Sequence, residues 1–230
     1  RFAYPDTVLE NMVETEVTGF AGVPSTFSIL LSRSRTSGMS FPALRYVTQA
    51  GGAMPAAVQK RVAAAVAPAK LYVMYGATEA APRLSYVEPD DLPRKWGSIG
   101  TPVPNVDLYV ADEEGRRLQA GTEGELVARG SNIMVGYWKD TAGTEEVLRQ
   151  GVYRTGDLGY EDEEGFLFVT GRARDILKVK GIRVSPREIE NALLALPGVI
   201  EAAVVGVEDD VLGEAPIAFV VTTGTEVGED

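Results

Sequence analysis

Two stretches of the chain gather side chains that could do chemistry. Tyr75–Glu79 reads YGATE and places a phenol, a hydroxyl and a carboxylate after an apolar segment. Tyr153–Asp157 reads YRTGD and puts an aspartate on a tight turn, and Gly171–Glu190 follows with arginines, a lysine-rich hairpin and a helix start. This layout suits the binding of a nucleotide between two domains. A strand end and an ordinary helix cap could also produce the first string, and an aspartate on a turn often makes only local hydrogen bonds.

The composition limits the chemistry to a few groups. The 230 residues include no Cys and no His, which removes thiol nucleophiles, imidazole bases, disulfides and most zinc sites. Carboxylates, Lys, Arg, hydroxyls and backbone groups remain. The formal charge of -11 argues against nucleic acid as the main partner, because proteins that bind its backbone carry a basic face. No apolar run approaches the roughly 18 residues of a membrane span, so no membrane insertion is expected.

Helix and strand signals in the first part of the chain predict a parallel sheet. Thr7 and Glu10 have the spacing of a capping box for a helix near the start. A further helix is expected from Pro55, its first residue, to about Ala67. Strands are expected over residues 17–23, 44–50 and 71–75. A helical crossover between strands requires parallel pairing, and ligands of such sheets bind beyond the carboxyl ends of the strands, where Gly51–Gly52 and Gly76–Glu79 would meet.

From about residue 96 the pattern changes to short segments separated by turns that are rich in Gly and Asp, which predicts a small antiparallel barrel or sheet. Lys180–Gly181 then joins two short apolar segments as a hairpin. Ser185 and Glu188 have capping-box spacing. The helix behind them is expected to bury three residues: Ile189, Leu193 and Leu196. Two more strands, over 201–207 and 216–222, complete a compact α+β unit, and a polar segment trails from Gly224.

The joint pattern of Tyr75–Glu79, Tyr153–Asp157 and Gly171–Glu190 resembles the adenylate-forming enzymes, which include acyl-CoA synthetases, luciferases and the adenylation domains of peptide synthetases. The resemblance spans nearly the whole chain. It implies an α/β fold made of part of a large parallel-sheet domain, a β-rich barrel-like subdomain and a small, truncated α+β C-terminal domain. The expected boundaries are 1–95, 96–171 and 172–230, and the last part includes the hinge.

The resemblance also implies roles for individual residues. Tyr75 would stack on adenine, Thr78 would meet the α-phosphate and Glu79 would hold Mg²⁺, with Gly76 beside the nucleotide. Such groups suit the chemistry, because in-line attack on phosphorus builds charge on its oxygens and a hydroxyl donor plus a metal stabilise that charge. Gly52 and Ala53 would border the nucleotide, since backbone without a side chain lets a flat base approach closely. The other interpretation of the Gly51–Gly52 pair is a tight turn at the end of a strand, with no role in ligand binding.

The second stretch receives roles from the same resemblance. Asp157 would accept hydrogen bonds from the ribose hydroxyls, and Arg172 would make another nucleotide contact. Arg174 occupies the hinge position, where Asp or Lys is usual. Lys178, as a catalytic residue, and Gly181 would belong to the hairpin that turns toward the active site for thioester formation, where Gly181 leaves room for a pantetheine arm. The other interpretation of Lys178 is a solvated edge strand.

The implied reaction has two steps, in which a carboxylate attacks ATP to give an acyl-adenylate and a thiol then displaces AMP. Its cofactors would be ATP or AMP, Mg²⁺ and coenzyme A, its partner a carboxylic acid, and its setting the cytoplasm. Ala77 and the Tyr137–Trp138 region favour coenzyme A over a carrier-protein pantetheine. An amino-acid-activating domain and a non-catalytic nucleotide-binding module remain alternatives. The expected pocket walls are small or apolar: Phe20, Gly22, Val23, Ala80 and Ala81.

Two parts of the implied machinery have no counterpart in the 230 residues. They are a Gly/Ser/Thr-rich phosphate loop and the lysine that bridges the substrate carboxylate and the α-phosphate. Arg1 is also not an initiator Met. The sequence is therefore expected to be an excised fragment that retains weak AMP affinity but adenylates nothing at a useful rate, because each missing part is worth on the order of a hundredfold in rate.

Overall fold

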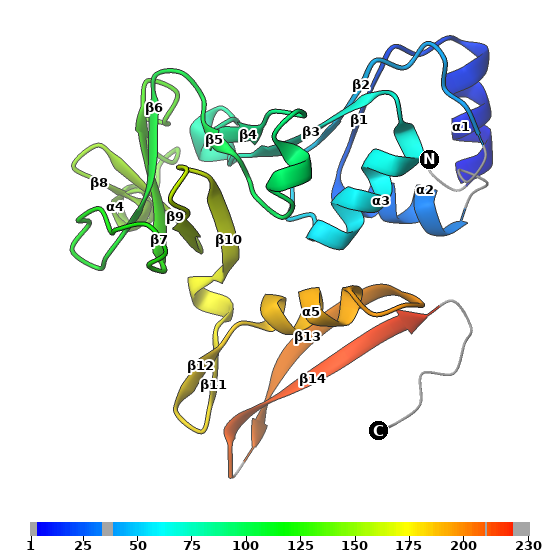
Figure 1. Cartoon of the computed structure of the whole chain (residues 1–230). Coiled ribbons are helices and arrows are strands. Elements are labelled where there is room, and N and C mark those ends of the chain that lie inside the picture. The colour runs from blue at the N-terminus through cyan, green and yellow to red at the C-terminus, as the bar shows by residue number, and fades with distance from the viewer. Residues whose placement is uncertain (1–3, 34–38, 210, 223–230) are drawn as a thin grey trace.

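The computed structural model describes residues 4–33, 39–209 and 211–222. Its helices and strands form three units that follow one another along the chain (Figure 1). An α/β unit comes first, a β-rich unit follows, and a small α+β unit lies below both in the view of Figure 1. The mixed α/β fold predicted from the sequence is confirmed. The three domain boundaries stay predictions, and the polar segment from Gly224 lies outside the described residues.

The first unit is a sheet with strand order β1-β2-β3-β4-β5. Strands β1, β2 and β3 are parallel, as their helical crossovers require, and β4 and β5 are antiparallel additions. Gln49 pairs with Val73, so the chain leaves β2 and β3 at the same edge of the sheet. The elements are α1 (Pro5–Glu14), β1 (Gly19–Gly22), α2 (Pro24–Arg33), β2 (Tyr46–Gln49), α3 (Ala56–Val66), β3 (Lys70–Tyr75), η1 (Thr78–Ala80), β4 (Ser85–Val87), η2 (Leu92–Arg94) and β5 (Thr101–Pro102).

The first helices begin differently from what their sequence signals indicate. Helix α1 starts at Pro5, with Tyr4 at the N-cap position and no side chain capping it. Proline suits a first helical position because it has no amide hydrogen to leave unpaired. Thr7 consequently lies inside the first turn, and the predicted capping box of Thr7 and Glu10 is wrong. Pro55 is the N-cap of α3 and not its first residue.

The second unit is an antiparallel sheet with strand order β10-β9-β7-β6, and the short strand β8 pairs with β9. The sequence predicted either a small antiparallel barrel or a sheet. The described strands form an open sheet, because β6 and β10 lie at its two edges and do not pair with each other. Leu108 and Leu126 of this unit pack with Ala80 and Leu84 of the first unit in one buried cluster. The elements are β6 (Val106–Ala111), β7 (Gly124–Gly130), α4 (Thr141–Val147), β8 (Leu148–Arg149), β9 (Val152–Glu161) and β10 (Leu167–Arg172).

The third unit begins with η3 (Ala173–Asp175) and the predicted hairpin of β11 (Leu177–Val179) and β12 (Ile182–Val184). Helix α5 (Pro186–Leu194) and the antiparallel strands β13 (Val199–Asp209) and β14 (Gly213–Thr222) complete it. Within the described residues, no helix is long and apolar enough to cross a membrane.

The start of α5 corrects two further predictions. The hydroxyl of Ser185 makes no cap and instead donates to the carbonyl oxygen of Thr170 at 2.7 Å, which fastens the start of α5 to β10. The predicted capping box of Ser185 and Glu188 is therefore wrong. Leu196, expected in the core, is 49% exposed, and Ile189 and Leu193 are only partly buried.

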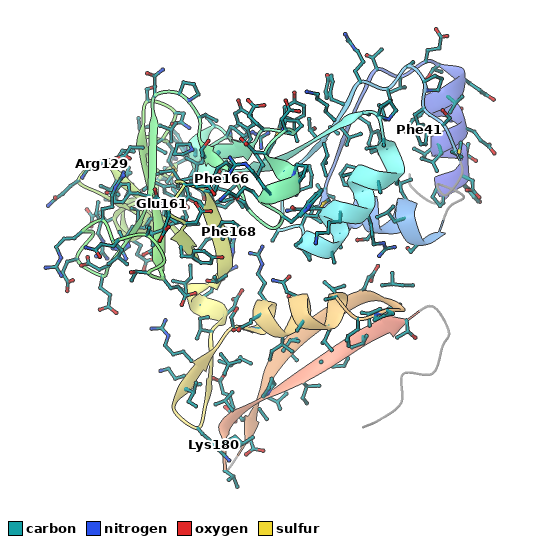
Figure 2. All side chains as sticks on the ribbon, in the orientation of Figure 1. Phe41, Arg129, Glu161, Phe166, Phe168 and Lys180 are labelled. Atoms are coloured by element: carbon teal, nitrogen blue, oxygen red, sulfur yellow. The ribbon has the colours of Figure 1, made fainter. Side chains whose placement is uncertain are left out.

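A buried lysine joins the first unit to the second. Lys95 follows η2, and its Nζ donates to Asp162 Oδ2 and Glu164 Oε1, both at 2.6 Å. The ammonium also lies 4.8 Å from the ring centroid of Phe166, which Figure 2 labels where the chain enters β10. Arg94 donates to Glu164 as well. The turn between β9 and β10 is thus held against the α/β unit by charge and by ring contact.

We expect Lys95→Met to lower the melting temperature by roughly 5 °C or more, because it leaves the Asp162 carboxylate beside that of Glu164 without the cation that pairs with both. Thermal unfolding followed by circular dichroism measures this. Lys60→Met is the matched control, since Lys60 is exposed on α3, and its melting temperature should stay within about 2 °C of the wild type. Equal stability of the two variants would show that the Lys95 contacts contribute nothing.

Candidate functional site

A large cleft lies where the three units meet. Its volume is about 1710 Å³, and residues of every unit line it. The α/β unit contributes Gly51–Met54 and Tyr75–Glu79, the β-rich unit contributes Tyr137 and Asp157, and the small unit contributes Arg187. The two loops of the α/β unit share the cleft because β2 and β3 are adjacent and parallel. The cleft therefore lies at the carboxyl ends of parallel strands, the usual ligand position in such sheets.

Two side chains from two units converge on one carboxylate, that of Asp157, in this cleft. The phenol of Tyr75 donates to Asp157 Oδ2 at 2.7 Å across 82 residues of sequence. Arg172 Nε lies 3.0 Å from Asp157 Oδ1. The Asp157 side chain is 11% exposed, whereas that of Arg172 is 50% exposed. Asp157 thus presents a nearly buried, charge-paired carboxylate whose oxygens keep further acceptor sites for a ligand.

The environment keeps the Tyr75 phenol in its donor form. Burial raises the pKa of Tyr75 well above its ordinary value, and the negative charge of Asp157 raises it further. The phenol is therefore protonated at neutral pH and can donate to Asp157. Burial likewise raises the pKa of the neighbouring Tyr153, with the charge of Glu79 as the next cause.

Asp157 owes its position to an irregular turn in β9. Gly156 has φ +73°, a left-handed conformation that suits glycine, and its N–H donates to Glu125 Oε1 at 3.0 Å. The Thr155 hydroxyl donates to the carbonyl oxygen of Leu126 at 2.7 Å and accepts from the Asp157 N–H at 3.0 Å. The pairing of β7 with β9 shifts register here. Such a bulge re-aims a side chain, here that of Asp157.

Gly76 is required by a close backbone approach. A Cβ at this position would lie 1.7 Å from the carbonyl oxygen of Pro82, a contact that real Cβ atoms do not make. The Leu84 N–H also donates to the Tyr75 carbonyl oxygen at 3.0 Å, which closes the loop. The glycine of the Tyr75–Glu79 string therefore allows the chain to double back beside the cleft.

Glu79 forms the other polar end of the cleft. Its Oε1 accepts a hydrogen bond from the Tyr137 phenol at 2.7 Å. That bond is the main reason why the pKa of Glu79 lies below its ordinary value, and it also raises the pKa of Tyr137 to about 12. No group of three His, Cys, Asp or Glu side chains in the described part could hold a metal by itself. A single carboxylate such as Glu79 fits Mg²⁺ only when phosphate oxygens and water supply the other ligands, the usual way in which Mg²⁺ is held beside nucleotides.

The residues predicted to form the pocket walls fall into two groups, those that line the cleft and those that do not. Gly22 and Val23 line the cleft, as do Gly52 and Ala53. Three others do not lie on it: Phe20, Ala80 and Ala81. Phe20 points into the α/β core with its ring centroid 6.0 Å from that of Phe27, and Ala80 is fully buried between the first two units. Ala81 is exposed in a left-handed turn with φ +46°. In this structure the strand and the turn direct these three side chains away from the cleft, so their role as pocket walls stays a prediction.

The residues assigned to the hinge and hairpin lie apart from one another. Arg174 lines the cleft, whereas Lys178 and Gly181 are exposed on the hairpin and lie outside it. Figure 2 shows Lys180 at the tip of this hairpin, pointing away from the other two units. The N–H of Lys178 donates to Glu214 Oε2 at 2.6 Å within the small unit. In this arrangement the structure does not bring Lys178 and Gly181 to the Tyr75–Asp157 pair.

Sequence reasoning missed several residues of the cleft, among them Tyr137, Ser185 and Arg187. No local signal links Tyr137 to Glu79, because 58 residues separate them. Arg187 had a possible signal, since it is a cation in the first turn of a helix next to the hinge. Burial lowers the pKa of Arg187, and the negative charges of Asp157 and Glu190 act in the opposite direction.

The cleft of this mixed α/β protein therefore has a nearly buried carboxylate at one end and a second carboxylate, bonded to a phenol, at the other. Two family models match the chain: "AMP-binding enzyme" over residues 1–138 and "AMP-binding enzyme C-terminal domain" over residues 188–230. The chain belongs to the AMP-binding enzyme family. This confirms the family resemblance read from the motifs.

Relatives and solved structures agree with this assignment. The chain is 34% identical to an indoleacetate–CoA ligase of Aromatoleum aromaticum over 94% of this chain and 42% of the relative. It is 37% identical to a long-chain-fatty-acid–CoA ligase of Escherichia coli O157:H7 over 97% of this chain and 39% of the relative. An amide bond synthetase, McbA of Marinactinospora thermotolerans, superposes with a TM-score of 0.88 at 32% identity over 98% of this chain and 46% of that one. The chain spans about two fifths of the length of the curated relatives that it matches.

Proposed function

We propose that the whole protein is an AMP-forming acid–thiol ligase, which activates a carboxylic acid with ATP and transfers the acyl group to coenzyme A. The observation that carries this proposal is the convergence of Tyr75 and Arg172 on Asp157, with Glu79 in the same cleft. The matched relatives named as CoA ligases support it. Because ATP and coenzyme A are the co-substrates, we propose the cytoplasm as its setting.

In the first step a carboxylate oxygen of the substrate attacks the α-phosphorus of ATP, a new P–O bond forms, and the bond to pyrophosphate breaks. Asp157 holds the ribose hydroxyls, Tyr75 stacks on adenine, and the Thr78 hydroxyl donates to an α-phosphate oxygen. Glu79 would hold Mg²⁺, which supplies charge stabilisation to the phosphate oxygens when bound. Arg172 and Arg187 add positive charge around the same ligand. Hydrogen-bond donors that are fixed beside the charge formed in the transition state usually make the largest contribution to the rate of such reactions.

In the second step the thiol attacks the acyl carbon, the thioester forms, and AMP leaves with both electrons of the acyl–oxygen bond. The thiol proton passes to solvent or to a released phosphate oxygen. We propose that rotation about Arg174 brings the β11–β12 hairpin, with Lys178 and Gly181, toward the cleft for this step. The hairpin pairs with β14 within the small unit, so it would move together with that unit.

The experiment that tests the function gives the whole protein ATP, Mg²⁺ and panels of fatty, aryl and amino acids, and measures pyrophosphate exchange and then the acyl product. Exchange with a fatty or aryl acid and thioester formation with coenzyme A support the proposal. Exchange with amino acids only would indicate a peptide-synthetase adenylation domain. An amine acceptor belongs in the panel because McbA is named an amide bond synthetase. Nucleotide binding without any exchange would indicate a non-catalytic module.

A further inference from the structure

Glu79 is held at two points by a segment far along the chain, residues 130–137. Its Oε1 accepts from the Tyr137 phenol at 2.7 Å, across 58 residues of sequence. Its carbonyl oxygen accepts from the Met134 N–H, also at 2.7 Å. The side chain and the backbone of Glu79 are therefore fixed by the same 130–137 segment.

The 130–137 segment is also anchored to the turn that follows Glu79. Asn132 Nδ2 donates to the carbonyl oxygens of Ala80 and Arg83, each at 2.9 Å. These bonds place the segment against the Glu79 turn independently of the phenol. The Tyr137–Glu79 bond consequently forms between two backbones that are already aligned, so little further conformational entropy is lost when it forms.

Tyr137 is supported from its other side by helix α4. The Tyr137 N–H donates to Thr144 Oγ1 at 2.8 Å, and that hydroxyl donates to the Asp140 carbonyl oxygen at 2.7 Å. Asp140 is the N-cap of α4, and its Oδ1 accepts from the Gly143 N–H at 2.9 Å. A continuous set of hydrogen bonds thus runs from a capped helix start to the carboxylate of Glu79.

We propose that Tyr137 is a positioning residue, which orients the carboxylate of Glu79 for a divalent cation shared with the phosphates of a bound nucleotide. This inference rests on the function proposed above. The phenol occupies one acceptor site of Oε1, and an ionised carboxylate has about four such sites, so a cation can bind at the same time. Glu79 lies partly exposed on a short turn, where loss of the Tyr137 bond would leave the carboxylate more rotamers to populate. Groups that orient a metal ligand in this way strongly affect metal affinity.

The test is a calorimetric titration of the whole protein with ATP, in Mg²⁺ and in EDTA, and with AMP in EDTA. We expect Tyr137→Phe to weaken ATP binding about tenfold in Mg²⁺ and to leave ATP and AMP binding in EDTA within about twofold of wild type. Thr144→Val removes the support of Tyr137 and should weaken Mg²⁺-dependent binding by about two- to threefold. Trp138→Phe is the matched control, because Trp138 is the next residue and is 89% exposed, and it should behave as wild type.

A double-mutant cycle with Glu79→Gln separates positioning from other effects. Glu79→Gln should remove the Mg²⁺ dependence, and adding Tyr137→Phe to it should change ATP affinity by less than about twofold. Unchanged or tighter binding of Mg²⁺ and ATP by Tyr137→Phe overturns the inference, and so does an equal loss with and without Mg²⁺. When wild type shows Mg²⁺-dependent binding and the variant matches it, only the inference fails. When wild type binds no nucleotide, the inference and the proposed function both fail.

Discussion

The substitution Asp157→Asn should weaken AMP binding to the chain by about 10- to 100-fold, because a hydrogen bond to a charged group contributes roughly 1.5–3 kcal/mol. Asparagine keeps the size of the side chain but removes its charge and turns one acceptor into a donor. Depending on how the amide turns, that donor would face either the Tyr75 phenol, 2.7 Å from Asp157 Oδ2, or Arg172 Nε, 3.0 Å from Asp157 Oδ1, and both of these groups are donors. Isothermal titration with AMP measures the change in dissociation constant.

A surface aspartate provides the control for this substitution. Asp107 lies on β6, where its side chain is 56% exposed and pairs with Arg117, outside the cleft. Asp107→Asn should leave the AMP dissociation constant within about twofold of wild type, since exposed ion pairs contribute little. An unchanged AMP affinity in Asp157→Asn, with the fold intact by circular dichroism, would exclude Asp157 from the nucleotide site.

The substitution Gly76→Ala should destabilise the fold by about 3 kcal/mol or more, because overpacking against fixed backbone cannot be relieved by a side-chain rotation. The added Cβ would lie 1.7 Å from the Pro82 carbonyl oxygen, and 2.7 Å from its carbon. The Tyr75–Glu79 loop must then move away from residues 82–83, so AMP binding should be lost as well. Urea unfolding gives the free energy, and its slope shows whether unfolding remains cooperative.

Gly52 is the matched control for Gly76, because both glycines line the cleft. A Cβ at Gly52 would meet only Pro24, with Cγ at 3.4 Å and Cδ at 3.5 Å, which is ordinary van der Waals contact. Gly52→Ala should therefore cost less than about 1 kcal/mol of stability. A Gly76→Ala variant as stable as Gly52→Ala would contradict the close backbone approach that the structure shows.

The parallel sheet was predictable from the sequence, because strand and helix lengths between Val17 and Tyr75 allow only a crossover connection. That connection also places Gly51–Gly52 and Gly76 at one edge. The helix starts were less predictable, because a local capping signal can lose to a neighbouring proline or to a hydrogen bond with another element. Pro5 outcompetes the Thr7 signal for the start of α1, and the Ser185 hydroxyl finds the Thr170 carbonyl in place of its own helix.

The site itself was only partly predictable. The resemblance predicted that Tyr75, Asp157 and Arg172 act together, but spacing alone could not place residues 82 positions apart within 2.7 Å. The pocket walls were harder, because the face on which Phe20 lies depends on which side of the sheet the helices cover. Tyr137 had no local signal, since its partner Glu79 comes from another unit of the fold.

The central claim is that one AMP molecule is held between the loop after β3 and the Asp157 turn. Titration of ¹⁵N-labelled chain with AMP tests it most directly by following amide chemical shifts. We predict that the amides of Tyr75–Glu79 and of Gly156–Asp157 shift together and give the same dissociation constant. Shifts confined to one of these segments, or different dissociation constants for the two, would contradict a shared site.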